Sequence, residues 1–258
     1  MVVARIKSLV KQVAPKGALR AYERYIRAAE HARNAKLTPQ QVFSEIYRKG
    51  VWGNAGGEGF YSGTGSSTQS IVEPYVAALT QFLATRPEDA RNVVDLGCGD
   101  FSVGRQLLPS CSSYTGVDVV PDLIRHLQAT VTDPRAQFKC MDMIDGELPA
   151  GDVCLIRQVF QHLSNAQIAK VLAKLDRYRT VFITEHFPPD SVALVPNKDK
   201  VHGGSIRFFE NSAVYVERAP FNFAPGRMEL VLEVPDHGFE GFESGTIRTF
   251  KFDFSDVR

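Results

Sequence analysis

The chain has 258 residues, of which 44% are hydrophobic and 23% are charged. This length and composition suit one large globular domain with a sizeable core, and they exclude collagen-like, coiled-coil and wholly disordered chains. The 30 Lys and Arg nearly balance the 29 Asp and Glu, so the net charge of +1 does not favour a nucleic acid or an acidic partner.

The N-terminal part of the chain is strongly basic. Residues 1–50 contain eleven Lys or Arg and three Glu, a net charge of +8, which leaves −7 for the remainder. Apolar residues at helical spacing between Ile6 and Val13, and the scarcity of helix breakers in 21–32, predict helices. We interpret them as a lid or an oligomer contact, which leaves a monomer and a homodimer both open. Peripheral contact of residues 1–33 with an anionic membrane is the alternative.

Segments that direct a chain into or across a membrane are not expected. No apolar run approaches the ~20 residues that span a bilayer, and Arg5, Lys7 and Lys11 interrupt the start too early for a secretory signal. The four cysteines form no C-x-x-C pair, so we expect reduced thiols in a cytoplasmic protein and no metal site.

The first well-marked helix begins after Thr38. The sequence Thr-Pro-Gln-Gln from this residue supplies an N-cap, a proline at the first helical position and a capping-box glutamine, and Gly50 ends the helix. Residues 51–67 are rich in Gly and Ser but contain the only Trp of the chain, which is unusual for a linker. We therefore predict a loop that closes over something. Residues 1–67 form a helical and Gly/Ser-rich capping region in this interpretation, and residues 68–258 form the main domain.

Beyond a helix predicted at 68–84, strands and helices alternate. The predicted strands are 93–96, 114–118, 138–140, 152–156 and 181–184, and the predicted helices are 101–108, 121–130 and 165–178. This order predicts an α/β fold whose parallel sheet carries helices on both faces, with right-handed crossovers. Alternating apolar residues in 229–234 and 246–253, with a turn between them, predict an antiparallel hairpin at the sheet edge.

The carboxyl ends of the strands carry residues that suggest a ligand. Ligands bind at this edge of an open α/β sheet, and the first strand runs into the sequence D-L-G-C-G-D at 95–100, whose glycines permit a tight turn. Ser102 replaces the third glycine of the nicotinamide and flavin fingerprint, so the pyrophosphate cradle is incomplete. Asp118 ends the second strand and can accept two hydrogen bonds from a ribose diol. Asp142 follows the third strand, in a position to receive an adenine amino group.

This order of a D-x-G-x-G turn and two acidic strand ends resembles the class I, Rossmann-like S-adenosylmethionine-dependent methyltransferases. The resemblance covers roughly residues 92–185 and extends to the final hairpin. It implies a Rossmann-like sheet of seven mostly parallel strands with a C-terminal antiparallel hairpin and an N-terminal helical cap, and S-adenosyl-L-methionine as cofactor. The cofactor contacts predicted on this basis are Trp52, Ser66, Asp95, Gly97, Gly99, Asp118, Val119, Asp142, Met143, Arg157 and Gln158.

The resemblance also implies which part of the cofactor these residues meet. Residues 95–99 surround the methionine part, and Asp118 holds the ribose. The pair 142–143 flanks the adenine, while the pair 157–158 lies near the sulfonium that carries the methyl group.

Three further stretches resemble a subgroup of bacterial small-molecule or glycan methyltransferases. They are Ile46-Tyr47 with Trp52-Gly53 and residues 62–66, Cys98-Gly99-Asp100-Phe101, and Asn197-Lys198-Asp199 with Gly203, Arg207 and Pro220-Phe221. This resemblance implies that residues 52–67 help to close the cofactor pocket, and the alternative is a surface loop with Trp52 in the core. The predicted substrate contacts are Tyr61, His202 and Arg207, and the alternative for His202 and Arg207 is that they only satisfy carbonyls of their own loop.

Methyl transfer to a hydroxyl or a protonated amine needs a base within hydrogen-bond reach. The candidates are His162 after the fourth strand and Glu185 and His186 after the fifth, and a histidine with a pKa near neutrality suits the role best. The alternative for His162 is that it only shapes the pocket. We predict an enzyme that methylates an oxygen, or a nitrogen, of a small molecule or sugar.

Other functions have less support. Residues 187–190 read Phe-Pro-Pro-Asp, the reverse of a motif of nucleic-acid amino methyltransferases, so we expect no nucleic-acid substrate. Carboxylates at the strand ends are too few for a catalytic Mg²⁺. A nicotinamide-dependent oxidoreductase and a non-catalytic cofactor-binding protein are the two alternative classes.

Overall fold

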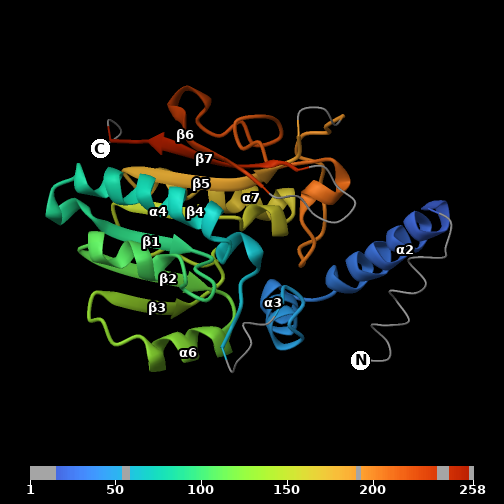
Figure 1. Ribbon diagram of the computed structural model, residues 1–258, viewed down its shortest axis with the longest axis horizontal. Coiled ribbons are helices and arrows are strands. Elements are labelled where there is room, and N and C mark those ends of the chain that lie inside the picture. Colours follow the sequence, from blue (N-terminus) through green and yellow to red (C-terminus); the bar gives the residue numbers. More distant parts are fainter. Residues whose placement is uncertain (1–15, 54–58, 190–192, 237–243, 256–258) are drawn as a thin grey trace.

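The computed structural model describes residues 16–53, 59–189, 193–236 and 244–255. One sheet forms its centre, with the strand order β3-β2-β1-β4-β5-β7-β6 (Figure 1). The strands are β1 (Asn92–Leu96), β2 (Ser113–Asp118), β3 (Ala136–Cys140), β4 (Val153–Arg157), β5 (Thr180–Phe187), β6 (Met228–Pro235) and β7 (Thr246–Asp253). The α-helices are α2 (Lys16–Asn34), α3 (Pro39–Arg48), α4 (Gln69–Ala84), α5 (Gly104–Leu107), α6 (Pro121–Thr130) and α7 (Asn165–Leu172). The helix expected between residues 6 and 13 lies outside the described residues.

Six strands run in one direction, and β7 alone runs opposite to them. β1 pairs in parallel with β2 and β4, and β3 and β5 continue the sheet in the same direction. β7 is antiparallel both to β5 and to β6. The predicted seven-stranded, mostly parallel sheet with an antiparallel hairpin at its edge is confirmed, and β7 has the bounds that the alternation predicted.

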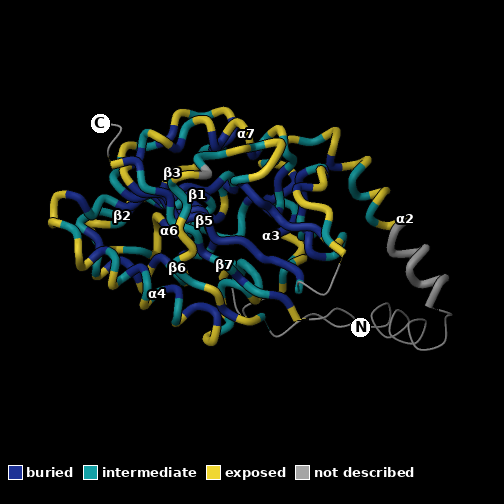
Figure 2. The backbone as a smooth tube through the Cα atoms, turned by 90° about the horizontal axis from the view of Figure 1, so that it is seen from above, coloured by how far each residue is buried: buried dark blue, intermediate teal, exposed yellow. Residues whose placement is uncertain are grey.

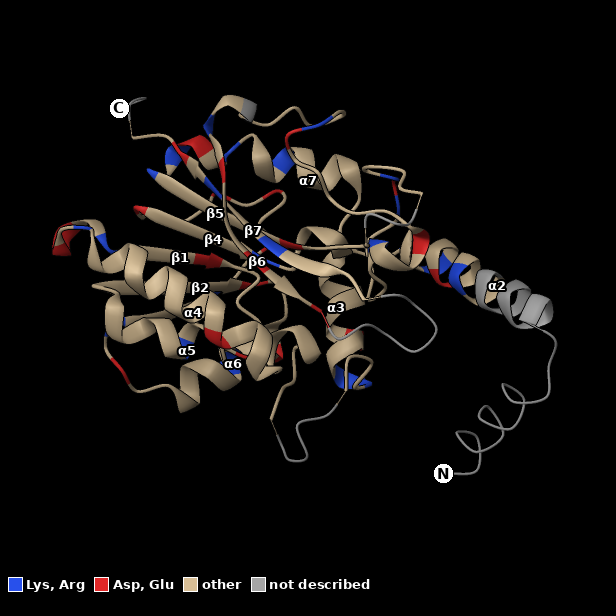
Figure 3. Cartoon of the chain, turned by 45° about the horizontal axis from the view of Figure 1, so that its top comes forward, with Lys and Arg blue, Asp and Glu red and all other residues tan. Residues whose placement is uncertain are grey.

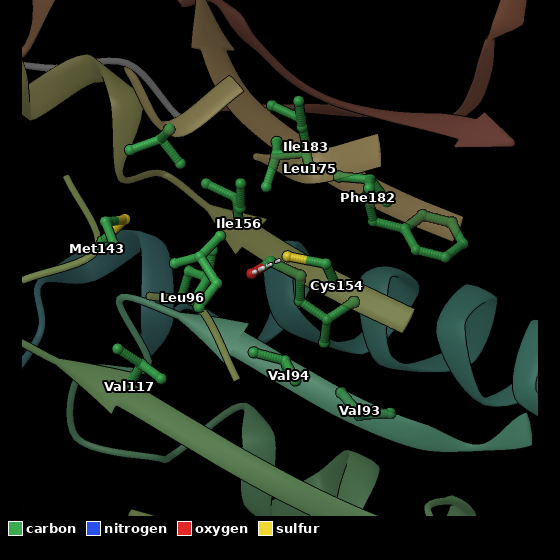
Figure 4. Packing of buried hydrophobic residues seen from close by; sticks show 14 of the residues in the cluster. Val93, Val94, Leu96, Val117, Met143, Cys154, Ile156, Leu175, Phe182 and Ile183 are labelled. Atoms are coloured by element: carbon green, nitrogen blue, oxygen red, sulfur yellow. Dashed lines mark hydrogen bonds between the residues drawn. The ribbon is translucent and has the colours of Figure 1, made fainter. Parts of the chain in front are cut away.

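Helices cover both faces of this sheet. α4, α5 and α6 lie on one side and α7 lies on the other (Figure 3). The central strands are apolar along their length because neither face meets water, and every residue of β5 is buried. Leu96, Ile156 and Phe182 are among the side chains that pack together here (Figure 4). Exposed residues lie along the outer helices and on α2 (Figure 2).

β5 is longer than the prediction. We expected a strand over 181–184, but it extends from Thr180 to Phe187 because β7 offers a hydrogen-bonding partner along the whole length. Glu185 and His186 therefore lie inside the strand rather than after it, and both are buried.

Two helices are shorter than predicted. Phe101 adopts a left-handed conformation with φ of +65°, so α5 begins only at Gly104. α7 ends at Leu172 rather than at residue 178, and a short 3₁₀ turn follows it. The Lys174 ammonium there donates to the carbonyl oxygen of Gly146 (2.9 Å), which binds the chain to the loop after β3.

The N-terminal helices differ in how they meet the sheet. α3 begins with the predicted capping box, in which Thr38 Oγ1 accepts from the Gln41 N–H (3.3 Å) and the Gln41 side chain accepts from the Thr38 N–H (2.9 Å). α3 also buries Val42 and Phe43 against the core, whereas α2 projects beyond the sheet (Figure 1). No helix in the described part of the chain is long and apolar enough to cross a membrane.

The chain between β5 and β6 returns over the carboxyl ends of the strands, and Asn197 anchors it. Asn197 Nδ2 donates to the carbonyls of Tyr215 (2.9 Å) and Ala219 (2.8 Å), and its Oδ1 accepts from the Tyr215 N–H (2.7 Å). Asn197 is buried and has a φ of +54°, a left-handed conformation that asparagine adopts more readily than most residues.

Replacing Asn197 by Ala should lower the free energy of unfolding by about 2–4 kcal/mol, because its buried partners lose their hydrogen bonds. Chemical denaturation measures this loss. Asn222→Ala is the control, since Asn222 also has a positive φ (+47°) but is exposed. Equal losses in the two variants would show that backbone conformation, and not anchoring, accounts for the effect.

Candidate functional site

A cavity opens at the carboxyl ends of β1, β2 and β4, where open α/β sheets bind ligands. We call it the first cavity. It holds about 830 Å³ of empty space, part of it open to solvent. Its lining consists of Pro39, Phe43, Tyr47, Trp52, Ser62, Ser66, Gly97, Cys98, Gly99, Asp118, Val119, Asp142, Met143, Ile144, Arg157, Gln158, Val159, His162 and Leu163.

This lining includes every predicted cofactor contact except Asp95. Asp95 lines a smaller cavity beside it, which shares Gly97 and Arg157 with the first. The Tyr114 hydroxyl donates to Asp95 Oδ2 (2.5 Å). Burial raises the pKa of Asp95 to about 6, while the bond from Tyr114 and the charge of Arg157 act in the opposite direction.

Asp118 places a buried carboxylate in the wall of the first cavity. Its Oδ2 accepts from the Gly99 N–H (3.3 Å) and its Oδ1 from the Val120 N–H (3.0 Å). Burial raises the pKa of Asp118 to about 6, and these N–H groups limit the rise. Because a carboxylate has about four acceptor positions, Asp118 keeps acceptor capacity for a ligand.

The turn after β1 needs glycine at two positions. Gly97 and Gly99 have φ of +81° and +55°, which disfavour any residue with a Cβ atom. A Cβ on Gly97 would lie 2.5 Å from a methyl group of Val159, and one on Gly99 would collide with the Ser62 hydroxyl. The backbone can therefore come close to a ligand at this edge, as the sequence predicted.

Residues 59–67, which we call the roof, are fastened to this turn. Ser62 N–H donates to Asp100 Oδ2 (2.8 Å), and Asp100 N–H donates to Ser62 Oγ (2.8 Å). The Tyr47 hydroxyl also bonds to Ser62 Oγ (2.9 Å). From β4, Arg157 Nη2 donates to the Gly65 carbonyl (2.5 Å). These bonds hold the Gly/Ser-rich segment over the first cavity.

A second cavity adjoins the first, and Trp52, Ser62, Gln158 and His162 line both spaces. It holds about 1530 Å³ of empty space, part of it open to solvent. Its other lining residues are Glu30, Val51, Gly63, Thr64, Gly65, Thr68, Ile71, Gln161, His186, Gly204, Ser205, Ile206, Phe209, Asp236 and Ile247.

His162 stands in the wall between the two cavities. Its Nδ1 lies 3.1 Å from the Gly203 carbonyl, which can only accept, so the neutral ring carries its proton on Nδ1. The ring centroid is 5.1 Å from that of Trp52. Burial, reinforced by the charge of Lys200, lowers the pKa of His162 to about 3. His162 is thus uncharged at neutral pH and only weakly basic.

His186 lies in the second cavity beside a carboxylate. Its Nε2 is 3.2 Å from Asp236 Oδ2, at the end of β6, and both side chains are largely buried. The imidazole stacks on Phe208, with 4.4 Å between ring centroids. A histidine oriented by a carboxylate is an arrangement that enzymes use for proton transfer.

Four predicted residues line none of these cavities. The Tyr61 hydroxyl bonds to Ser67 (2.8 Å), and His202 bonds to Gln167 and the Leu37 carbonyl. Arg207 donates to the Leu163 carbonyl (2.8 Å). The fourth residue is Glu185. Sequence reasoning missed the bond between Ser62 and Asp100, although both lie in stretches that we singled out, and it missed Asp236 and Glu30.

The described residues contain no group of three or more His, Cys, Asp or Glu side chains that could hold a metal ion.

Comparison with known proteins identifies the central part of the chain. Residues 93–179, about a third of the chain, match the model of a family described as a methyltransferase domain. This part of the chain is therefore similar to methyltransferase domains. The family match agrees with the prediction of a methyltransferase. The sequence matches none of the curated proteins.

Solved structures show the same fold. The magnesium protoporphyrin IX methyltransferase of Synechocystis PCC 6803 with bound SAM is 13% identical, with a TM-score of 0.51 over 84% of this chain and 98% of that one. The structure of the same Synechocystis enzyme with bound SAH is also 13% identical, with a TM-score of 0.50 over 84% of this chain and 100% of that one. The N-methyltransferase NodS of Bradyrhizobium japonicum WM9 in complex with SAH is 14% identical, with a TM-score of 0.49 over 71% and 87%. At such identities the likeness concerns the fold alone.

Glu185 should make the stability of the enzyme depend on pH. Its carboxylate accepts from the N–H groups of Phe160 (2.8 Å) and Gln161 (3.1 Å), and burial raises its pKa to about 8. Between pH 6.5 and 7.5 the folded chain keeps a proton that the unfolded chain has lost. The free energy of unfolding should therefore fall as the pH rises, by about 1 kcal/mol per pH unit.

Chemical denaturation at several pH values checks this fall in the free energy of unfolding. The measurement compares the unchanged chain with the Glu185→Gln variant. The variant should lose the fall in stability over that interval. The same slope in both proteins would contradict the raised pKa.

Proposed function

We propose that the enzyme transfers the methyl group of S-adenosylmethionine to an oxygen of a small molecule or sugar, with nitrogen as the second choice. The observation that carries this is the wall of Trp52, Gln158 and His162 shared by two cavities, because it lets two ligands approach each other. A hydroxyl is preferred because histidines, and not a cage of aromatic rings, line the second cavity.

The residues of the first cavity fit the cofactor. Asp118 would accept from the ribose hydroxyls, and Asp142 with Met143 would flank the adenine. The turn at 97–99, where a Cβ atom has no room, would let the backbone approach the methionine part. The cofactor supplies a methyl carbon that is activated by a positively charged sulfur. The protein orients the acceptor and excludes water.

Isothermal titration should show binding of S-adenosylhomocysteine and none of NADH. Asp118→Ala should weaken this binding about 10- to 100-fold, because charge-assisted hydrogen bonds to the ribose are lost. Asp122→Ala is the control, since Asp122 is exposed on α6 and pairs with Arg125. Binding of NADH instead would favour the oxidoreductase alternative and contradict the methyltransferase.

We further propose His186 as the base that takes the proton of the acceptor, with Asp236 as its positioning residue. The pair lies in the second cavity, at 3.2 Å from each other. His162 keeps a place in the wall, but with a pKa of about 3 it would shape the pocket rather than bind a proton.

With an acceptor found by screening for release of S-adenosylhomocysteine, His186→Asn should lower kcat about 10²- to 10⁴-fold. The affinity of this variant for S-adenosylhomocysteine should stay unchanged, because His186 does not line the first cavity. His126→Asn, on α6, serves as the control. If His162→Asn abolished turnover while His186→Asn kept it, the two roles would be reversed.

The remaining features of the chain stay proposals. Residues 1–67 form the capping region, and Phe43, Tyr47 and Trp52 of that region line the first cavity in support of this. We place the protein in the cytoplasm, as a monomer or a homodimer. Contact of residues 1–33 with a membrane is the alternative, as is a non-catalytic cofactor-binding protein for the whole chain.

A further inference from the structure

The second cavity is lined by two carboxylates and by no Lys or Arg among the described residues. The carboxylates belong to Glu30 from α2 and to Asp236 from the end of β6. His162, with its pKa lowered to about 3, adds no positive charge near neutral pH.

Lys200 does not line the cavity, although its charge interacts with those of Glu30 and His162. Its ammonium donates to the carbonyl of Gln161 (3.3 Å) and to the carbonyl and hydroxyl of Ser205, which uses its three protons. Burial, with the charge of Arg207 next in effect, lowers its pKa to about 8. An anionic group in the second cavity would thus find carboxylates and no ammonium or guanidinium donor in the lining.

The uncharged part of the lining is rich in hydrogen-bonding groups. The hydroxyls of Thr64 and Thr68 and the amides of Gln158 and Gln161 belong to it. Amides and hydroxyls both donate and accept hydrogen bonds, and carboxylates accept them. A lining with all three kinds of group suits a molecule with several hydroxyl groups. Trp52 and Phe209 add apolar rings.

We infer that the second cavity binds an uncharged acceptor with several hydroxyl groups, of the sugar or polyol class, and that Glu30 and Asp236 reject acceptors that carry a carboxylate or phosphate. This inference rests on the proposed function. Like charges at close range in a partly dry site repel, and no Lys or Arg of the lining offsets this repulsion.

The reaction balances with such an acceptor. The acceptor oxygen forms a bond to the methyl carbon, and the bond from that carbon to sulfur breaks with its electron pair kept by sulfur. The hydroxyl proton goes to the imidazole of His186. The products are a methyl ether and a neutral thioether, and no oxidant or further reactant is required.

Matched pairs of methyl glycosides test the inference on the full chain saturated with S-adenosylhomocysteine. Each pair holds a neutral hexoside and its uronic acid, which differ only in one carboxylate, for glucose, galactose and mannose. Trp52 is the only Trp of the chain and lines both cavities, so its fluorescence reports binding without turnover. Saturation-transfer NMR of the glycosides gives an independent measure.

At least one neutral glycoside should bind, and its uronic acid should bind at least tenfold more weakly. Glu30→Gln should narrow this difference, whereas Glu147→Gln, a control at an exposed site after β3, should leave it unchanged. Equal or tighter binding of the uronic acid, no effect of Glu30→Gln, or no binding of any neutral glycoside would overturn the inference. Failure of S-adenosylhomocysteine itself to bind would instead contradict the proposed function, so the two failures are distinct.

Discussion

Asp118 stands at the end of β2 with its carboxylate largely removed from water, and each of its oxygens accepts a backbone N–H. One of those N–H groups belongs to Gly99, so the acid at the end of β2 also fixes the turn that leaves β1. A buried carboxylate is costly unless hydrogen bonds compensate it. The turn can provide one of these bonds, from Gly99, because Gly97 and Gly99 adopt conformations that other residues disfavour. The first cavity depends on this arrangement.

The roof extends the same connection to the N-terminal part of the chain. Ser62 and Asp100 exchange two hydrogen bonds, and Tyr47 of α3 joins them, so turn, roof and capping helix are held together. Trp52 precedes the roof and packs beside His162. Its indole donates to the Gly204 carbonyl (3.2 Å), which brings in the segment between β5 and β6. The wall between the cavities is thereby built from three distant parts of the sequence.

Sequence reasoning reached the features that depend on local order. The bounds of β7 and α6 follow from alternation and from Pro121, and the glycine turn follows from residues 95–100. It failed where a distant partner decides. β5 reaches Phe187 because β7 pairs with it, which put His186 and Glu185 inside a strand.

The dependence on distant partners also explains why the sequence did not predict the surroundings of several site residues. Nothing local to Asp236 or Glu30 indicates that they meet in one cavity, because β6 and α2 lie at opposite ends of the chain. Arg207 and His202 bond to backbone carbonyls, as buried polar groups in an irregular segment must, and this is the alternative that the sequence left open for them. The basicity of His162 depends on burial and on Lys200, which no motif records.

A crystal structure of the chain with S-adenosylhomocysteine tests the central claim most directly. The account predicts the nucleoside in the first cavity, with both ribose hydroxyls on the carboxylate of Asp118, and the sulfur facing the wall of Trp52, Gln158 and His162. A ribose bound away from Asp118, or a sulfur turned away from that wall, would contradict it.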